Sequence, residues 1–210
     1  MRFIKTDYQP IVWLGDRVRI IDQTRLPREE LYVELDDYRS VASAIRELKV
    51  RGAPSIGIAG AYAVAIGARK IDAVSRAVFL EKLNDIITFI AATRPTARNL
   101  FFALERMRQS AGTGKSVTQI KKLLIDEAMK IHSEEAEATG RISQSGAGLI
   151  KDGWTILTHC NTGPLATSGY GTALGVIIAA YRQQKRIKVL ATETRPLLQG
   201  ARLTTWELKK

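Results

Sequence analysis

The stretch WTILTHCNTGPLATSGYGTALGV, from Trp154 to Val176, decides the fold of this chain. It begins with a short β-branched and apolar run that ends at Cys160, continues through a glycine-rich turn, and then becomes helical. A strand that passes through such a turn into a helix N-terminus is typical of α/β ligand sites, because backbone N–H groups and the helix dipole favour anions there. The stretch therefore predicts a small, negatively charged ligand.

The composition is that of a folded, basic protein. With 210 residues, 45% of them hydrophobic, the chain can bury a sizeable core. Its 32 Lys and Arg against 21 Asp and Glu give a formal charge of +11, which raises nucleic acids, acidic membranes and phosphorylated metabolites as partners. The densest basic run, QQKRIK at residues 183–188, lacks the interleaved aromatic side chains of a single-strand binder. A solvated basic surface is therefore favoured over nucleic-acid binding.

Cysteine usage and hydropathy indicate where the protein works. A single cysteine forbids an internal disulfide, and residues 1–10 lack the apolar core of a secretion signal, so we expect a reducing cytoplasmic setting. The longest apolar run, Ile56 to Ala68, is too short to span a bilayer and is rich in Gly and Ala. It predicts a tightly packed internal helix, and we expect no membrane contact.

The first 150 residues predict a small sheet followed by helices. Two apolar runs flank Gly15-Asp16 and read as a β-hairpin, and a third strand follows. Asp36 or Asp37 can cap a helix that we expect to end at Arg51-Gly52. The expected strands are 11–14, 17–21 and 31–35, and the further helices are 78–91, one from Asn99, and 117 to about 145.

Two junctions between these helices carry arginine. In RGAPSIG, from Arg51 to Gly57, Gly52 can end one helix and Pro54 suits the first turn of the next, so an arginine lies beside a new helix N-terminus. TRPTARNL, from Thr93 to Leu100, is a similar junction with Arg94 and Arg98. The two could converge on one anion. The alternative to an anion site is that Gly, Ala and Pro only allow a tight turn between packed helices, and that the arginines are exposed and only aid solubility.

Two other features carry no function in this interpretation. GTGKS at residues 112–116 lacks the earlier glycine and the preceding strand of a nucleotide-binding loop, so it is interpreted as a linker with a helix start. His132 lies near the apolar stripe of the long helix and is interpreted as a packed or surface histidine.

From about residue 150 the pattern changes to strand, helix, strand, helix. The strand into Cys160 is followed by a helix over 171–182, a strand over 187–192 and a last helix from about 198 to 210. We therefore expect an α/β protein with a sheet and helical domain at 1–150 and the first two βα units of a Rossmann-like domain at 151–210. Two parallel strands leave a sheet edge open, so we expect another chain, or a longer polypeptide, to complete this domain.

Cys160 is the candidate for chemistry. His159 is a poor partner for a nucleophilic pair, because adjacent strand residues point to opposite faces. With no second cysteine and no histidine cluster, the sequence predicts no metal site. A lone cysteine at a strand end can also be a small buried hydrophobe. Its place above a glycine-rich loop favours a functional thiol.

These residues resemble the S-methyl-5-thioribose-1-phosphate isomerases of methionine salvage. The matching segments are RGAPSIG from Arg51, TRPTARNL from Thr93, ILTHCNTGPLATSGYGTALGVI from Ile156 and ETRPLLQGARLTTWEL from Glu193. They occur in the family's order along nearly the whole chain. Related groups are the ribose-1,5-bisphosphate isomerases and the regulatory subunits of initiation factor 2B.

The resemblance implies an aldose-ketose isomerisation of S-methyl-5-thio-D-ribose 1-phosphate without metal or organic cofactor, in a homodimer. It implies that Arg51, Gly52, Ala53, Arg94 and Gln199 bind the sugar phosphate. Cys160 would act in the hydrogen-transfer step or stabilise its transition state, which suits a neutral thiol in an apolar site. Residue reasoning found the same helix starts but could not supply the substrate.

The chain also departs from the family. Members continue well beyond this length, and their further segment carries an aspartate that acts as proton donor and an Asn-Lys pair that binds substrate. We therefore expect a C-terminally truncated chain with little or no isomerase activity alone. The alternatives are a ribose-1,5-bisphosphate isomerase, which would need residues for a second phosphate, and a non-catalytic interaction protein of the initiation-factor type.

Overall fold

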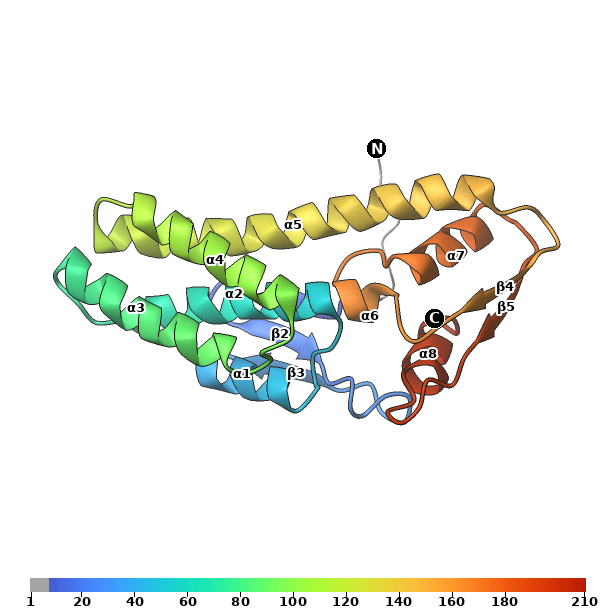
Figure 1. Cartoon of the computed structure of the whole chain (residues 1–210), viewed down its shortest axis with the longest axis horizontal. Helices are drawn as coiled ribbons and strands as arrows, with labels where there is room; N and C mark the ends of the chain where they lie inside the picture. The colour runs from blue at the N-terminus through green and yellow to red at the C-terminus, as the bar shows by residue number, and fades with distance from the viewer. Residues whose placement is uncertain (1–7) are drawn as a thin grey trace.

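The computed structural model describes residues 8–210. Residues 1–7, which contributed to the expectation that a secretion signal is absent, lie outside this range. The helices and strands form an elongated arrangement in which the long helix α5, Val117–Leu149, runs along nearly the whole length (Figure 1). None of the helices within the described range has both the length and the apolar character needed to cross a bilayer.

The predicted hairpin and third strand form an antiparallel sheet in the order β1-β2-β3. The strands are β1 Ile11–Trp13, β2 Val18–Ile21 and β3 Tyr32–Leu35. Gly15 makes the hairpin turn at φ 95°, a left-handed conformation that glycine adopts without steric cost. Val18 and Ile20 of the central strand are fully buried and join the main core.

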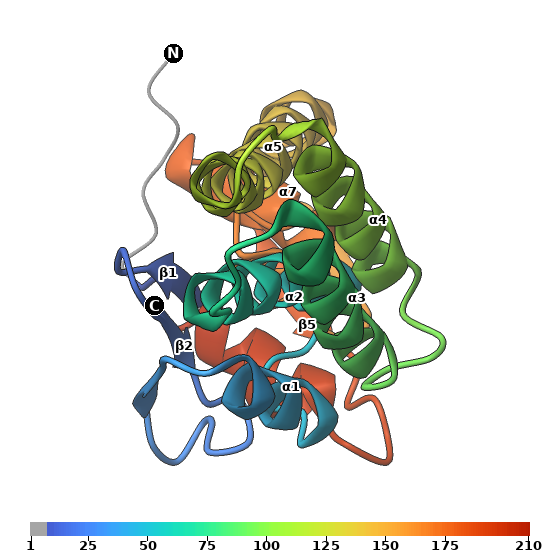
Figure 2. The same ribbon diagram turned by 90° about the vertical axis from the view of Figure 1, so that its left-hand side faces the viewer.

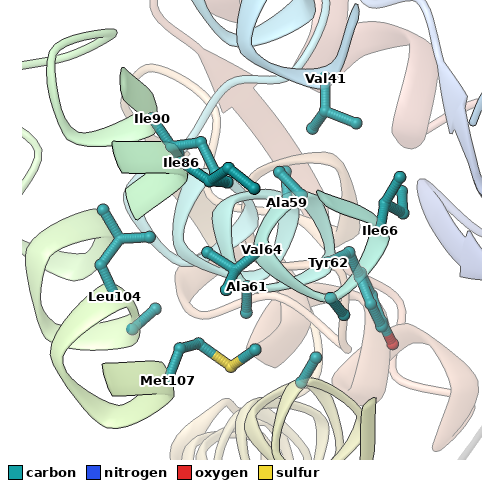
Figure 3. Close-up of a cluster of buried hydrophobic side chains, with 14 of the residues drawn as sticks. Val41, Ala59, Ala61, Tyr62, Val64, Ile66, Ile86, Ile90, Leu104 and Met107 are labelled. Atoms are coloured by element: carbon teal, nitrogen blue, oxygen red, sulfur yellow. The ribbon is translucent and has the colours of Figure 1, made fainter. Parts of the chain in front are cut away.

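Helix α2 is the centre of the larger core, as the run 56–68 predicted. Four helices surround it: α1 Tyr38–Arg46, α3 Arg76–Ala91, α4 Arg98–Thr113 and α5 (Figure 2). Every residue of α2, Ala53–Lys70, from Ser55 to Ala68 is buried. Small residues allow this, since a Cβ on Gly60 would lie 2.4 Å from Leu100 Cδ1. The surrounding side chains, such as Ile90 and Met107, pack directly onto its Ala and Val residues (Figure 3).

The first helix ends earlier than predicted. Asp37 caps α1 as expected, accepting a hydrogen bond from the Arg39 backbone N–H at 2.8 Å. The helix stops at Arg46 rather than at Arg51-Gly52, because Leu48 adopts a left-handed conformation with φ 63° and turns the chain. Residues 47–52 are therefore a connecting turn, which leads directly into α2.

The second half contains the predicted parallel unit. Strands β4 Thr155–Thr158 and β5 Lys188–Ala191 pair in parallel, and helix α7 Ala173–Arg182 connects them. The α/β fold class is thus confirmed. On one face of this small sheet the neighbouring Leu157 and Leu190 remain 68% and 47% exposed. The division into domains at residue 150 stays a prediction, since α5 contacts both α2 and α7.

Two short helices beside β4 and β5 differ from the prediction. A four-residue helix, α6 Pro164–Thr167, interrupts the glycine-rich turn that was expected to be irregular. The last helix, expected from about 198, begins as a π-helix over Gly200–Thr204 and continues as α8, Thr205–Glu207. Six buried side chains tie these segments to the N-terminal sheet, namely Tyr8, Ile21, Leu26, Leu165, Leu203 and Trp206. This contact brings the cysteine loop to the N-terminus of α2.

Candidate active site

The N-terminus of α2 forms one wall of the site. Gly52 precedes the helix at φ 89°, and a Cβ there would lie 2.2 Å from the backbone oxygen of Ala166 in α6. Pro54 lies in the first turn, and no side chain caps this end of the helix. The two halves of the chain therefore meet at Gly52 with almost no space between their backbones. The positive end of the α2 dipole lies at the same place.

The predicted binding residues surround one cavity of about 580 Å³. This volume is within the usual range for small-molecule sites. Arg51, Gly52 and Ala53 come from the start of α2, Arg94 from the α3–α4 junction, and Gln199 from the segment after β5. The remaining lining residues are Arg46, Leu48, Ile56, Thr96, Ala97 and Leu197. The structure thus brings together all five residues that the resemblance assigned to the sugar phosphate.

Gln199 connects the two halves across the cavity. Its hydrogen-bonding neighbours fix the orientation of the amide, whose oxygen accepts from Arg51 Nη2 at 2.5 Å and whose nitrogen donates to the Thr194 backbone oxygen at 3.0 Å. The Arg51 guanidinium is therefore held from the second half of the chain. Such a held guanidinium is preorganised for a phosphate or carboxylate.

The electrostatic field in the cavity is positive. Among the described residues that line it there are three arginines and no acidic side chain. Burial lowers the pKa of Arg51, and the nearby positive charges of Arg202 and Arg94 lower it further, while Cys160 acts in the opposite direction. Arg202 is fixed through hydrogen bonds to the backbone oxygens of Gln23, Leu26 and Leu197. The arrangement favours an anion that would relieve this repulsion.

Cys160 lies two residues after the end of β4 in a strained backbone conformation. Its φ is 61°, a left-handed value that costs a non-glycine residue about 1 to 3 kcal/mol and that often occurs at functional sites. The thiol is half-buried, and the side chain is near enough to Arg51 to contribute to the electrostatic environment of the guanidinium. Cys160 does not itself line the cavity described above. Its side chain lies near Arg51, which does line the cavity.

The two histidines stay outside this chemistry. His159 is exposed, and its Nδ1 is 2.8 Å from the Thr192 hydroxyl. The imidazole therefore forms its hydrogen bond with Thr192 and not with the Cys160 thiol. His132 is packed, which is one of the two states expected: its Nδ1 is 2.9 Å from the Tyr62 hydroxyl and its Nε2 is 3.0 Å from the Ser168 backbone oxygen. Burial lowers the pKa of His132, and the Ser168 carbonyl opposes this shift.

Glu207 is a buried carboxylate that sequence reasoning did not single out. It is 3% exposed and accepts hydrogen bonds from the Tyr8 hydroxyl at 2.7 Å, the Leu165 backbone N–H at 2.7 Å and Asn161 Nδ2 at 2.5 Å. It therefore anchors the loop that follows Cys160. Burial raises the pKa of Glu207 to about 7, although its three hydrogen-bond donors oppose the shift. No local pattern could have found it, because Tyr8 lies 199 positions away.

We expect Glu207→Gln to remove a pH dependence of stability. The folded-state pKa, about 7, lies above the ordinary 4.5, so this group's contribution is fully present below pH 4.5 and is lost as the pH rises through 7. The difference of about 2.5 pKa units corresponds to roughly 3 kcal/mol. Urea unfolding at several pH values should show the wild type losing about this much relative to the variant. A stability difference that stays constant from pH 4.5 to 8 would contradict the assignment.

Comparison with known proteins gives three findings. The profile of the Initiation factor 2 subunit family matches residues 49–210. A methylthioribose-1-phosphate isomerase from Dehalococcoides mccartyi (strain CBDB1) is 59% identical over 200 residues, which cover 95% of this chain and 60% of that protein. One from Geobacter metallireducens is 53% identical over 205 residues, covering 97% of this chain and 59% of that relative. The chain thus spans about 60% of the length of these relatives.

Solved structures agree with the sequence comparison. The crystal structure of 5-methylthioribose 1-phosphate isomerase from Pyrococcus horikoshii superposes with a TM-score of 0.92 at 35% identity, covering 97% of this chain and 58% of that one. The translation initiation factor eIF-2B, subunit delta, from A. fulgidus gives a TM-score of 0.88 at 44% identity, covering 97% and 59%.

Proposed function

The chain belongs to the Initiation factor 2 subunit family, and from this premise we propose that it acts in the isomerisation of S-methyl-5-thio-D-ribose 1-phosphate to S-methyl-5-thio-D-ribulose 1-phosphate. The observation that carries the proposal is the acid-free cavity lined by three arginines, which lies beside Cys160. The names of the relatives that are 53% to 59% identical support the same reaction. The protein would serve methionine salvage.

The residues have distinct roles in this proposal. The phosphate lies between Arg51 and Arg94 at the start of α2, where the helix dipole and the guanidinium groups stabilise its charge. The backbone at Gly52 and Ala53 approaches the phosphate closely, because Gly52 carries no side chain. Gln199 holds Arg51 and also contacts the sugar. No metal or organic cofactor takes part in the proposed reaction.

The reaction rearranges bonds within the sugar. The hydrogen on C2 moves to C1, the C2 hydroxyl loses its proton and becomes a carbonyl, and the bond between C1 and the ring oxygen breaks as that oxygen gains a proton. Substrate and product have the same atoms. Cys160 acts in the hydrogen transfer or stabilises its transition state, and the half-buried position next to Arg51 limits the access of water.

Two other functions compete with this one. Arg46 adds a third arginine to the cavity and could receive a second phosphate, which would favour ribose 1,5-bisphosphate. The likeness to the A. fulgidus protein, named a translation initiation factor subunit, would favour a non-catalytic interaction role. The free thiol and the anion cavity favour an isomerase over an interaction role, and the names of the relatives favour the methylthioribose phosphate over the bisphosphate.

The proposal includes a homodimer in the cytoplasm. The reducing cytoplasm keeps Cys160, the single cysteine of the chain, as a free thiol. Sedimentation of the purified protein at several concentrations tests the dimer, and a monomer at all of them would contradict it.

Binding is the direct test of the proposed ligand. We expect titration calorimetry of the chain to give saturable binding of S-methyl-5-thioribose 1-phosphate, with ribose 1,5-bisphosphate binding more weakly and the phosphate-free sugar more weakly still. Tighter binding of the bisphosphate would favour the second isomerase. An absence of binding by either sugar phosphate would support the interaction role and overturn the proposal.

Turnover needs a separate measurement. We expect the chain alone to convert the sugar phosphate weakly or not at all. A chimera that joins it to the remaining part of the D. mccartyi relative should convert it. In that chimera Cys160→Ser should lower kcat by about 100-fold, as expected for loss of a group that acts on the transferred hydrogen, while binding persists. An active chimera with an equally active Cys160→Ser variant would contradict the role of the thiol.

A further inference from the structure

The left-handed backbone of Cys160 is held at both ends by threonine hydroxyls. The Cys160 backbone N–H donates to Thr194 Oγ1 at 3.1 Å, and its backbone oxygen accepts from Thr204 Oγ1 at 2.5 Å. A strained conformation persists only where its surroundings fix it. These two hydroxyls are the groups that fix it here: Thr194 lies in the segment after β5, and Thr204 lies in the π-helix.

Thr204 contacts Cys160 from the end of the π-helix. Thr204 is its last residue and is fully buried. A π-helical turn contains one more residue than an α-helical turn and changes the direction of the side chains that follow, and such turns are frequent at functional sites. Thr204 and Glu207 lie three residues apart across α8, so the spacing of an α-helical turn places them on the same side, where both contact Asn161.

The direction of the Thr204 hydroxyl is determined by its neighbours. Asn161 Nδ2 donates one hydrogen to Glu207 Oε2 at 2.5 Å and the other to Thr204 Oγ1 at 3.2 Å. Thr204 Oγ1 is thus an acceptor toward Asn161, and its own hydrogen is free to point at the Cys160 carbonyl. Glu207, which also binds Tyr8 and Leu165, fixes the far end of this chain of hydrogen bonds.

We propose that Thr204 is a positioning residue for Cys160, whose hydroxyl holds the cysteine backbone in the left-handed conformation and so keeps the thiol beside Arg51. The proposal rests on the proposed function, because the thiol's place beside Arg51 matters for the isomerisation. The hydrogen bond from the Thr204 hydroxyl to the Cys160 backbone oxygen is present without a ligand. It can therefore be tested without any substrate.

The test is the rate at which iodoacetamide alkylates Cys160 at fixed pH. The chain has no other cysteine, so the rate reports one site. A thiol beside a cationic guanidinium reacts faster than one moved away from it. We expect Thr204→Val, which keeps the shape but removes the hydroxyl, to slow alkylation about tenfold. Thr204→Ser, which keeps the hydroxyl, should restore the wild-type rate.

A merely structural role predicts the opposite result. If the hydroxyl only stabilised the fold, its loss would increase opening of the site and alkylation would become faster. A rate in Thr204→Val that equals or exceeds the wild-type rate therefore overturns the proposal. Thr205→Val is the matched control, because the Thr205 hydroxyl bonds to the Ala201 backbone oxygen and not to Cys160, so its rate should remain that of the wild type. If Thr204→Val does not fold, Thr204→Ala replaces it with the same expectation.

The outcome can be separated from that of the binding test. Slower alkylation in Thr204→Val without any sugar phosphate binding would support the positioning role and reject the proposed function. Sugar-phosphate binding without a change in the alkylation rate of Thr204→Val would support the proposed function and reject the positioning role. In the active chimera the positioning role further predicts a lower kcat for Thr204→Val with an unchanged KM, and recovery in Thr204→Ser.

Discussion

Replacing Gly52 with alanine is expected to destabilise the protein by about 4 kcal/mol or more, one of the largest effects available from a single methyl group. The φ of 89° is unfavourable for any residue with a Cβ. The added Cβ would lie 2.2 Å, 2.4 Å and 2.7 Å from the backbone O, Cα and C of Ala166. All three are backbone atoms, so α2 and α6 would have to separate.

Urea unfolding measures this effect, and Gly112→Ala is the control. Gly112 lies in α4 without a positive φ, and a Cβ there would meet no atom within 4 Å. That variant should be stabilised by roughly 0.5 to 1 kcal/mol, because alanine favours the helix. A Gly52→Ala protein that unfolds at the wild-type urea concentration would show that the contact between α2 and α6 is not as close as described.

Arg51→Ala is expected to weaken the binding of S-methyl-5-thioribose 1-phosphate by about 3 kcal/mol, or roughly 100-fold in Kd. The guanidinium is half-buried and oriented by Gln199, so its removal deletes a prepared charge-assisted contact and leaves the Gln199 amide oxygen without its partner. Arg51→Lys should recover only part of the affinity, because an ammonium group cannot form the same pair of parallel hydrogen bonds.

Calorimetry measures this loss, and Arg98→Ala is the matched control. Arg98 belongs to the same junction as Arg94, but it is exposed and does not line the cavity. The Arg98→Ala variant should therefore bind the sugar phosphate with the wild-type Kd. Equal losses in Arg51→Ala and Arg98→Ala would mean that general positive charge, and not the cavity, attracts the ligand. In that case the arginines at the two junctions would only aid solubility, which is the alternative that the sequence left open.

Features encoded by neighbouring residues could be predicted. The hairpin follows from Gly15-Asp16 between apolar runs, and the start of α2 from Gly52 and Pro54, because these residues restrict the backbone locally. The parallel unit followed from the alternation of patterns after residue 150. The place of His132 near an apolar stripe predicted a packed or surface histidine, and the structure shows that it is packed.

Features that depend on distant contacts could not be predicted. Helix α1 ends at Arg46 because of the left-handed Leu48, and leucine gives no signal for that conformation. The π-helix and α6 exist in tightly packed surroundings whose partners come from elsewhere in the chain. Helical periodicity alone treats residues 198–210 as ordinary α-helix.

The candidate site divides in the same way. Cys160 and Arg51 could be chosen as candidates because Cys160 follows a strand and Arg51 precedes a helix, whereas the convergence of Arg51, Arg94 and Gln199 depends on the fold. Family resemblance supplied Gln199, which residue reasoning had not singled out as an anion contact. Thr204 and Glu207 act through hydrogen bonds across 44 and 46 positions of sequence, so the sequence alone offered no reason to choose them.

The cavity's walls come from three separate parts of the chain, and this has a thermodynamic consequence. A ligand that contacts Arg51, Arg94 and Gln199 together is a non-covalent cross-link, because it binds only when the two halves are docked. Each such ligand transfers part of its binding free energy to folding, about 2.7 kcal/mol at a concentration 100 times its Kd. The concentration of the anion would then set the fraction of molecules in which the two halves are docked, and the same arginines would govern both recognition and stability.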